Sequence, residues 1–309
     1  MIAVIGSIIP VILVIAVGAA LRQVEFLNEE QWQGFEKIAY YIFFPAIIMH
    51  TLANARLGDV PFWTLSATLL AVIAAMIALC LALRVPIVRF GVTDNPGFTS
   101  IFQGVARWNA FVALAIAGQL YGAEGVTLIA VAIITMLPVL NLCSVLVLAR
   151  YGASARPTAG TIAIALVRNP FIWAAAVGIV LNILPFDLPR IGMTALSILG
   201  QGALVAGLIS VGSGLVIHKL KRPSNAAAIA TGLRLLVTPA FTAAFGAMFG
   251  LSGTALAVAL ITTAVPGAMG SYLMARQMGG DAELMAEILT IQMATAMVTI
   301  PVVMAVFAA

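Results

Sequence analysis

The stretch TALAVALITTAVPGAMGSYLMARQMGGD, from Thr254 to Asp281, is apolar and long enough to cross a lipid bilayer as a helix. Pro266 and Gly267 stand in its middle, and both interrupt helices, because proline lacks a backbone donor and glycine is too flexible. Irregular backbone is tolerated at this depth only where protein or a polar cavity satisfies it. The stretch therefore predicts a helix broken near mid-membrane at a binding site. The new half-helix should begin near Gly267 and turn its positive end toward an anion. The alternative is a plain proline kink without a ligand.

The composition of the chain is that of an integral membrane protein. Of its 309 residues, 63% are hydrophobic and only 8% are charged, and the mean hydropathy is +1.14. The net charge of +4 does not indicate a nucleic-acid partner, because the basic residues are scattered over short connections. Two cysteines and two histidines form no disulfide framework or metal-binding pattern. We expect no cofactor and no bound metal.

Apolar stretches joined by short polar connections predict ten membrane-spanning helices in one all-α membrane domain, residues 1–309. The expected spans are 2–21, 35–54, 61–84, 98–121, 124–149, 162–184, 191–217, 225–249, 254–277 and 282–307. The chain divides near its middle into 1–155 and 156–309, with five spans each. Because five is odd, the halves would enter the membrane from opposite sides, so that a sequence echo between them would be an inverted repeat.

Such an echo exists. GQLYGAEGVTLIA, from Gly118, lies against RQMGGDAELMAEI, from Arg276, since in both a helix ends at a glycine-containing turn that is followed by an acidic residue and the next span. In this register the Arg107–Asn109 region of the fourth span lies opposite Pro266 in the ninth.

The basic residues indicate the orientation. With the N-terminus outside, most of the 15 lysines and arginines fall on the cytoplasmic side, Arg56 and Arg190 fall on the other, and Arg107 and Arg234 lie within spans. We expect a multi-pass protein of the plasma (bacterial inner) membrane with both termini on the non-cytoplasmic side.

Several stretches together carry a family resemblance. They are YYIFFPAIIMHTLA, RWNAFVALAIAGQLYGAEGV, VRNPFIWAAAVGIVLNILPFDLP, LRLLVTPAF, AVPGAMGSYLMARQMGGD and ILTIQMATAMVTIP. In this order the chain resembles the auxin efflux carrier family, which includes the plant PIN proteins and bacterial malate or malonate permeases. The resemblance implies ten helices as two inverted five-helix repeats, with helices 4 and 9 broken and crossing at the substrate site. It also implies a scaffold of helices 1, 2, 6 and 7 and a moving transport unit of helices 3–5 and 8–10.

The fourth span departs from the family pattern. Glycine and proline usually follow its asparagine and open the helix, whereas Asn109 is followed here by AFVALA. The Asn109 amide can itself compete with the helical hydrogen bonds and open the backbone locally. Arg107, two residues earlier, is suited to clamp a carboxylate with two hydrogen bonds. The alternative for Arg107 is a structural ion pair with a carboxylate such as Glu287.

Two sets of candidate functional residues result. The candidates for substrate binding are Asn109, Arg107, Pro266, Gly267, Ser271, Tyr272 and Thr263. The candidates for coupling or gating are Glu287, Arg234 and His50, as charged or titratable groups within spans. For each polar side chain the alternative is a hydrogen bond that only holds neighbouring helices together.

The sequence shows no motif of an intramembrane enzyme and no ATP-binding loop, so we predict no catalytic activity. The leading hypothesis is a secondary transporter that moves small organic anions, auxin-like or dicarboxylate, by alternating access. The alternative is a proton- or sodium-coupled symporter or antiporter of the bile-acid symporter or sodium–proton exchanger type. The expected partners are the anion and the lipid bilayer, and an exposed scaffold face would allow a homodimer.

Overall fold

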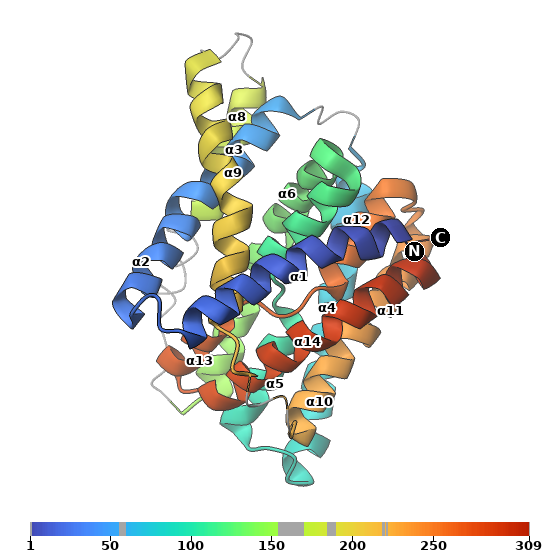
Figure 1. Cartoon of the computed structure of the whole chain (residues 1–309). Coiled ribbons are helices and arrows are strands. Elements are labelled where there is room, and N and C mark those ends of the chain that lie inside the picture. The colour runs from blue at the N-terminus through green and yellow to red at the C-terminus, as the bar shows by residue number, and fades with distance from the viewer. Residues whose placement is uncertain are drawn as a thin grey trace.

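The computed structural model describes residues 2–55, 60–153, 170–183, 190–217, 220 and 222–308, and in this part of the chain every regular element is a helix (Figure 1). The protein is thus all-α, as predicted. The elements are α1 (Ile2–Gln23), α2 (Glu29–Ile38), η1 (Ala39–Phe43), α3 (Phe44–Asn54), α4 (Phe62–Arg89), α5 (Asn95–Ala106), α6 (Ala110–Tyr151), α8 (Pro170–Ile183), α9 (Arg190–Ser213), α10 (Asn225–Gly232), η4 (Leu233–Val237), α11 (Thr238–Phe249), α12 (Gly253–Ala264), α13 (Gly270–Met278) and α14 (Ala282–Phe307).

Several helices are suited to a bilayer. By length and composition, five helical segments of the described chain can cross a membrane: Phe62–Arg89, Asn95–Tyr151, Arg190–Ser213, Asn225–Phe249 and Ala282–Phe307. Of the expected span 162–184, the structure describes only residues 170–183. The expected span 191–217 is too long, because α9 ends at Ser213 and the Val216 amide donates instead to the Thr290 hydroxyl of α14 at 3.0 Å.

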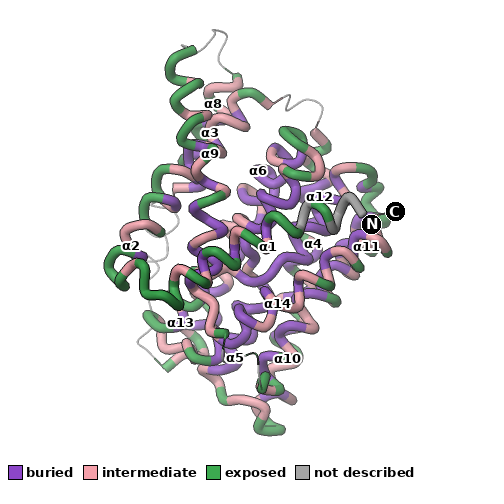
Figure 2. Tube along the Cα trace, viewed as in Figure 1, coloured by how far each residue is buried: buried purple, intermediate pink, exposed green. Residues whose placement is uncertain are grey.

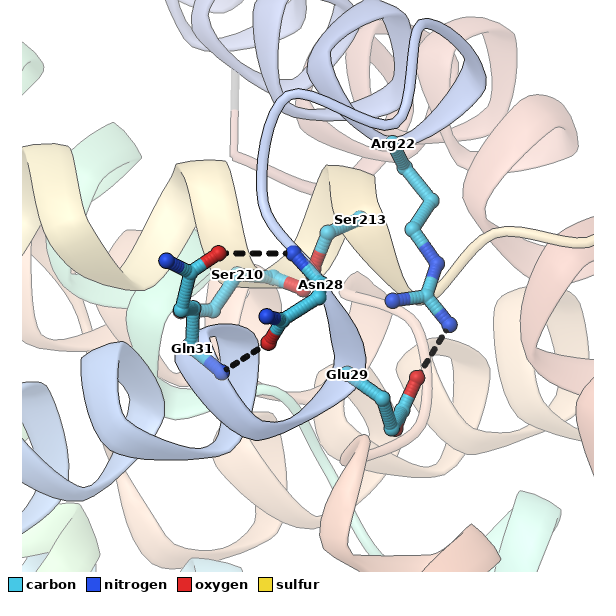
Figure 3. A network of polar contacts seen from close by, with 6 residues as sticks. All are labelled: Arg22, Asn28, Glu29, Gln31, Ser210 and Ser213. Carbon is cyan, nitrogen blue, oxygen red and sulfur yellow. Dashed lines mark hydrogen bonds and ion pairs between the residues drawn. The ribbon is translucent and has the colours of Figure 1, made fainter.

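The second helix begins earlier than predicted, at Glu29 and not at residue 35. Asn28 and Gln31 form a reciprocal capping box, in which each side chain accepts from the backbone N–H of the other at 2.9 Å (Figure 3). Arg22 donates to the exposed Glu29 carboxylate at 2.6 Å, and this hydrogen bond lowers the pKa of Glu29. The polar first turn therefore lies outside the apolar span that hydropathy detects.

Two wide π-helical turns, η1 and η4, each lie just before a proline, Pro45 and Pro239. A proline ring clashes with the carbonyl four residues earlier in an α-helix, and a wider turn relieves that clash. At η4 the Thr238 hydroxyl also donates to the Leu233 carbonyl at 2.8 Å. These turns keep each helix continuous, and they shift the directions in which the side chains after the turn point.

Close helix packing joins α1 to α9, and α3 to both α8 and α9. α3, α8 and α9 lie together on one side of the molecule, whereas α1 runs from α9 across the molecule to the side where the C-terminus lies (Figure 1). Glycines allow this approach, as small residues do between membrane helices. A Cβ atom at Gly212 of α9 would overlap the Ile15 carbonyl of α1, and one at Gly178 of α8 would lie 2.9 Å from Leu52 of α3. The backbones of this group are therefore nearly in contact.

The substitution Gly212→Leu should separate α1 from α9 and lower the unfolding midpoint of the detergent-solubilised protein by roughly 5 °C, since overpacking costs about 1–3 kcal/mol. The matched control is Gly192→Leu on the same helix, because a Cβ there meets no atom within 4 Å. Equal midpoints for the two variants would show that the α1–α9 contact is not tight.

The most deeply buried elements are the short helices α5 and α12. All ten residues from 97 to 106 and nearly all of α12 are buried, whereas α2 and the outer face of α1 are largely exposed (Figure 2). α5 and α12 have 12 residues each, and both end in an extended residue, Arg107 (φ −80°, ψ 148°) and Val265 (φ −71°, ψ 154°). After each break the helix continues to a glycine with positive φ: Gly122 (57°), which interrupts α6 as a kink, and Gly279 (72°), which follows α13. The two halves of the chain thus share a local pattern around these breaks.

Candidate functional site

The two helix breaks touch each other. One lies between α5 and α6, at residues 107–109, and the other between α12 and α13, at residues 265–269. The backbone N–H of Asn109 donates to the Pro266 carbonyl at 2.9 Å. Pro266 of one half of the chain and Asn109 of the other are thereby brought into one place by a main-chain hydrogen bond.

Asn109 opens the fourth span without the help of glycine or proline. Its Oδ1 atom accepts from the backbone N–H groups of Phe111 (3.1 Å) and Val112 (3.2 Å), which makes Asn109 the N-cap of α6. The side chain is only 2% exposed, and Nδ2 has no hydrogen-bond partner in the described chain. Asn109 therefore both forms the break and leaves a buried donor unused.

The second break is longer than predicted. The helix resumes at Gly270 and not near Gly267, because backbone groups of the connection are bound by other elements. Gln292 of α14 accepts from the Gly267 N–H at 2.8 Å, and its amide group donates to the Gly104 carbonyl at 3.0 Å and to the Ala230 carbonyl at 3.4 Å. One buried side chain thus binds backbone beside both breaks.

The Arg107 guanidinium lies over the start of α13. Its Nη1 atom is 3.2 Å from the Met274 sulfur, and Nη2 is 3.6 Å from the position of a Cβ at Gly270. The structure shows no ion pair of Arg107 among the described residues, so the alternative of a pair with Glu287 is not formed. Glu287 instead accepts from the Ser224 N–H at 2.6 Å, at the start of α10. The charge of Arg107 is left available to an anion.

Further polar groups near the breaks lack hydrogen-bond partners within the described chain. These are both amide atoms of Gln103 and the hydroxyl of Ser271, and neither side chain is exposed. Thr99 faces Gly280, at the C-terminal end of α13, and Arg107 faces the start of α13. Gln103 lies between Thr99 and Arg107 at spacings of four residues, which places it on the face of α5 that is turned to α13. Buried polar groups are normally paired, so the unpaired state of Gln103 and Ser271 requires an explanation.

Arg234 has a different environment from Arg107. It is 1% exposed and donates to three backbone carbonyls, those of Val265 (2.8 Å), Thr262 (2.9 Å) and Val105 (3.3 Å). These carbonyls belong to the C-terminal ends of α5 and α12. Arg234 therefore joins the C-terminal ends of α5 and α12.

Three further predicted residues have different surroundings. The Thr263 hydroxyl donates to the Ala259 carbonyl (2.9 Å) and accepts from Thr242 of α11 (2.8 Å), so it fastens α12 to α11. Tyr272 is 38% exposed on the outside of α13. His50 lies on α3 about 9 Å beyond Phe44 along the helix axis.

Aromatic contacts connect the breaks to the α1, α3, α8 and α9 group. Phe111, in the first turn of α6, stacks on Phe44 of α3 with ring centroids 3.8 Å apart, and Gly207 of α9 makes room for both rings. Met269, in the second break, packs against Gly214 at the end of α9. The crossing is thus covered on this side by a few apolar contacts.

The electrostatics of the crossing favour an anion. The N-termini of α6 and α13 carry partial positive charge, and Arg107 adds a full charge beside them. Among the described residues there is no cluster of three metal-ligating side chains. The arrangement suits binding of a carboxylate through a guanidinium, amide and hydroxyl donors.

Sequence reasoning missed Gln103 and Gln292, although both are polar residues inside apolar spans. That position was the available signal, since a polar side chain in a membrane helix usually has a buried partner or a ligand. Gln292 has buried partners, whereas both amide atoms of Gln103 lack a hydrogen-bond partner in the described chain.

Comparison with known proteins shows which membrane proteins the chain is similar to. Residues 154–304 match the family model described as "Membrane transport protein". Over 118 residues the chain is 27% identical to "Probable auxin efflux carrier component 1c" of Oryza sativa subsp. japonica, and this alignment covers 36% of the chain and 20% of that relative's length. The long apolar helices and the match to this family model show that the chain is a multi-pass integral membrane protein, whose second half is similar to membrane transport proteins of the auxin efflux carrier type.

Proposed function

We propose that this protein is a secondary transporter that moves small organic anions with a carboxylate group across the membrane by alternating access. The observation that carries the proposal is Arg107, which lies at the junction of two broken helices without a carboxylate partner in the described chain. Broken helices that meet at mid-membrane commonly form substrate sites of transporters, with half-helix N-termini directed at anionic groups. The substrate carboxylate would lie between Arg107, the Asn109 Nδ2 atom and the start of α13, within reach of Gln103 and Ser271.

The architecture in this proposal is ten spans in two inverted five-helix repeats, 1–155 and 156–309. The common pattern of α5 with α6 and of α12 with α13 supports it. The glycine-packed group of α1, α3, α8 and α9, together with α2, would be the scaffold, and the remaining helices would move. Both termini would then lie on the non-cytoplasmic side of the plasma (bacterial inner) membrane, as the distribution of basic residues favours.

Movement of the transport unit would separate contacts between the two groups of helices. These include the stack of Phe44 on Phe111 and the packing of Met269 against Gly214. Apolar contacts of this kind can slide and re-form without leaving a polar group unpaired, which suits an interface that opens in every cycle.

The test is uptake of radiolabelled malonate, malate and indole-3-acetate into liposomes that hold the purified protein, with an imposed membrane potential. Accumulation of at least one of these anions above empty liposomes, with saturation and competition by the unlabelled compound, is the expected result. Failure of every carboxylate to accumulate in either direction would contradict the proposed function.

The substitution Asn109→Asp should separate the two roles of this residue. Aspartate keeps an oxygen that caps α6, so the unfolding midpoint should stay within about 2 °C of wild type. It also removes the Nδ2 donor and adds a negative charge at the anion site, and uptake should fall by about 10-fold or more. Asn109→Ala is the comparison, because it loses the cap as well and should be destabilised by about 1 kcal/mol. Normal uptake by Asn109→Asp would exclude this residue from substrate binding.

A further inference from the structure

The guanidinium of Arg234 occupies a cation site that is made of backbone carbonyls. It donates to Val265, Thr262 and Val105 at 2.8, 2.9 and 3.3 Å. The last carbonyls of a helix have no partner inside the helix and carry the negative end of its dipole. Arg234 therefore places one positive charge against the negative ends of both α5 and α12.

No carboxylate shares this charge. Within the described chain the structure shows no ion pair of Arg234, and all three of its hydrogen bonds go to main-chain oxygens. A buried charge requires compensation, and here the two helix ends supply it. The arrangement is that of a metal cation held by carbonyl oxygens, with a guanidinium in the place of the ion.

Local structure fixes the guanidinium in this place. Arg234 lies in the π-helical turn η4, whose width is supported by the bond from Thr238 to the Leu233 carbonyl and by Pro239. The turn directs the long Arg234 side chain from the continuous helix of α10, η4 and α11 toward the ends of the short helices α5 and α12. Unlike an ion from solution, this charge cannot dissociate during a transport cycle.

Transporters with broken helices often bind their coupling sodium ion through unwound carbonyls and half-helix C-terminal ends. We infer that Arg234 is a covalently attached substitute for such a coupling cation, so that transport in this protein needs no sodium ion. This inference rests on the proposed transport function for its consequence, although the cation site itself does not. It predicts that removal of the side chain creates a site for a free monovalent cation.

The experiment compares the unfolding midpoints of wild type, Arg234→Ala and Arg89→Ala. Each protein is measured in choline chloride alone and with about 10 mM guanidinium or sodium ion, and this guanidinium concentration is far too low to denature a protein. Arg89 is the control because it is an exposed arginine at the end of α4. Arg234→Ala should lose roughly 5–10 °C, and guanidinium should restore at least about half of this loss in a saturable way. Wild type and Arg89→Ala should shift by less than about 1 °C. A midpoint of Arg234→Ala that is the same in guanidinium, sodium and choline would overturn the inference.

A second pair of variants covers the case in which Arg234→Ala does not fold. Arg234→Lys keeps an attached cation and should retain most of the stability, whereas the neutral Arg234→Met should not. Equal stability of Arg234→Met and wild type would overturn the inference, as would a sodium requirement of wild-type uptake. Because the stability measurements need no substrate, guanidinium rescue without any carboxylate uptake would contradict the proposed function and leave the cation site in place.

Discussion

Replacing Arg107 with methionine should reduce uptake of the transported anion by about 100-fold and leave the protein folded. A charge-assisted hydrogen bond contributes about 1.5–3 kcal/mol, and loss of about 2.7 kcal/mol lowers affinity 100-fold. The fold should tolerate the change because, in the described chain, the guanidinium makes no ion pair and its hydrogen bond goes to the Met274 sulfur. The measurement is concentration-dependent uptake into liposomes, together with the unfolding midpoint.

Two variants make this result specific to a carboxylate clamp. Arg107→Lys keeps the charge but cannot form two parallel hydrogen bonds, so uptake should fall by only about 10-fold. Arg276→Gln removes an exposed arginine from α13 and should transport like wild type. If Arg107→Met takes up the anion at the wild-type rate, Arg107 does not bind substrate and the proposed site is wrong.

Replacing Gln292 with leucine should lower the unfolding midpoint by roughly 5–15 °C, the largest stability effect that we expect. Leucine fills a similar space but leaves the Gly267 N–H and the Gly104 carbonyl buried without partners. Each unsatisfied group costs about 1–3 kcal/mol, and the midpoint changes by a few degrees per kcal/mol.

The matched control is Gln277→Leu, an exposed glutamine on α13. Its midpoint should stay within about 2 °C of wild type. A Gln292→Leu protein as stable as this control would mean that the two breaks do not depend on the Gln292 side chain.

The positions of the breaks could be predicted from the sequence only in part. Pro266 and Gly267 act locally, through a missing donor and a flexible backbone, and the ninth span is broken there. The start of α13 could not be predicted, because it depends on hydrogen bonds with residues that are distant in the sequence. The Gly267 N–H donates to Gln292, and the Pro266 carbonyl accepts from the Asn109 N–H. The break at Asn109 required tertiary support in the same way, since no helix-breaking residue marks it.

The surroundings of Arg107 and Arg234 could likewise be predicted only in part. Hydropathy indicated that Arg107 and Arg234 lie within spans, and both do lie in the protein interior or at the crossing. Their different surroundings depend on which helix ends face them, and on a π-turn that sequence periodicity does not reveal. Thr263 was misleading because its hydroxyl is already used within the protein.

The bond between the two breaks uses only main-chain atoms, the Asn109 N–H and the Pro266 carbonyl. Of the standard residues, only proline at position 109 would remove the donor. Mutations can therefore alter the side chains around the crossing, and with them the preferred anion, while the link that holds the halves together is inherited unchanged. A protein of this design can diverge in specificity by single substitutions without first losing its architecture.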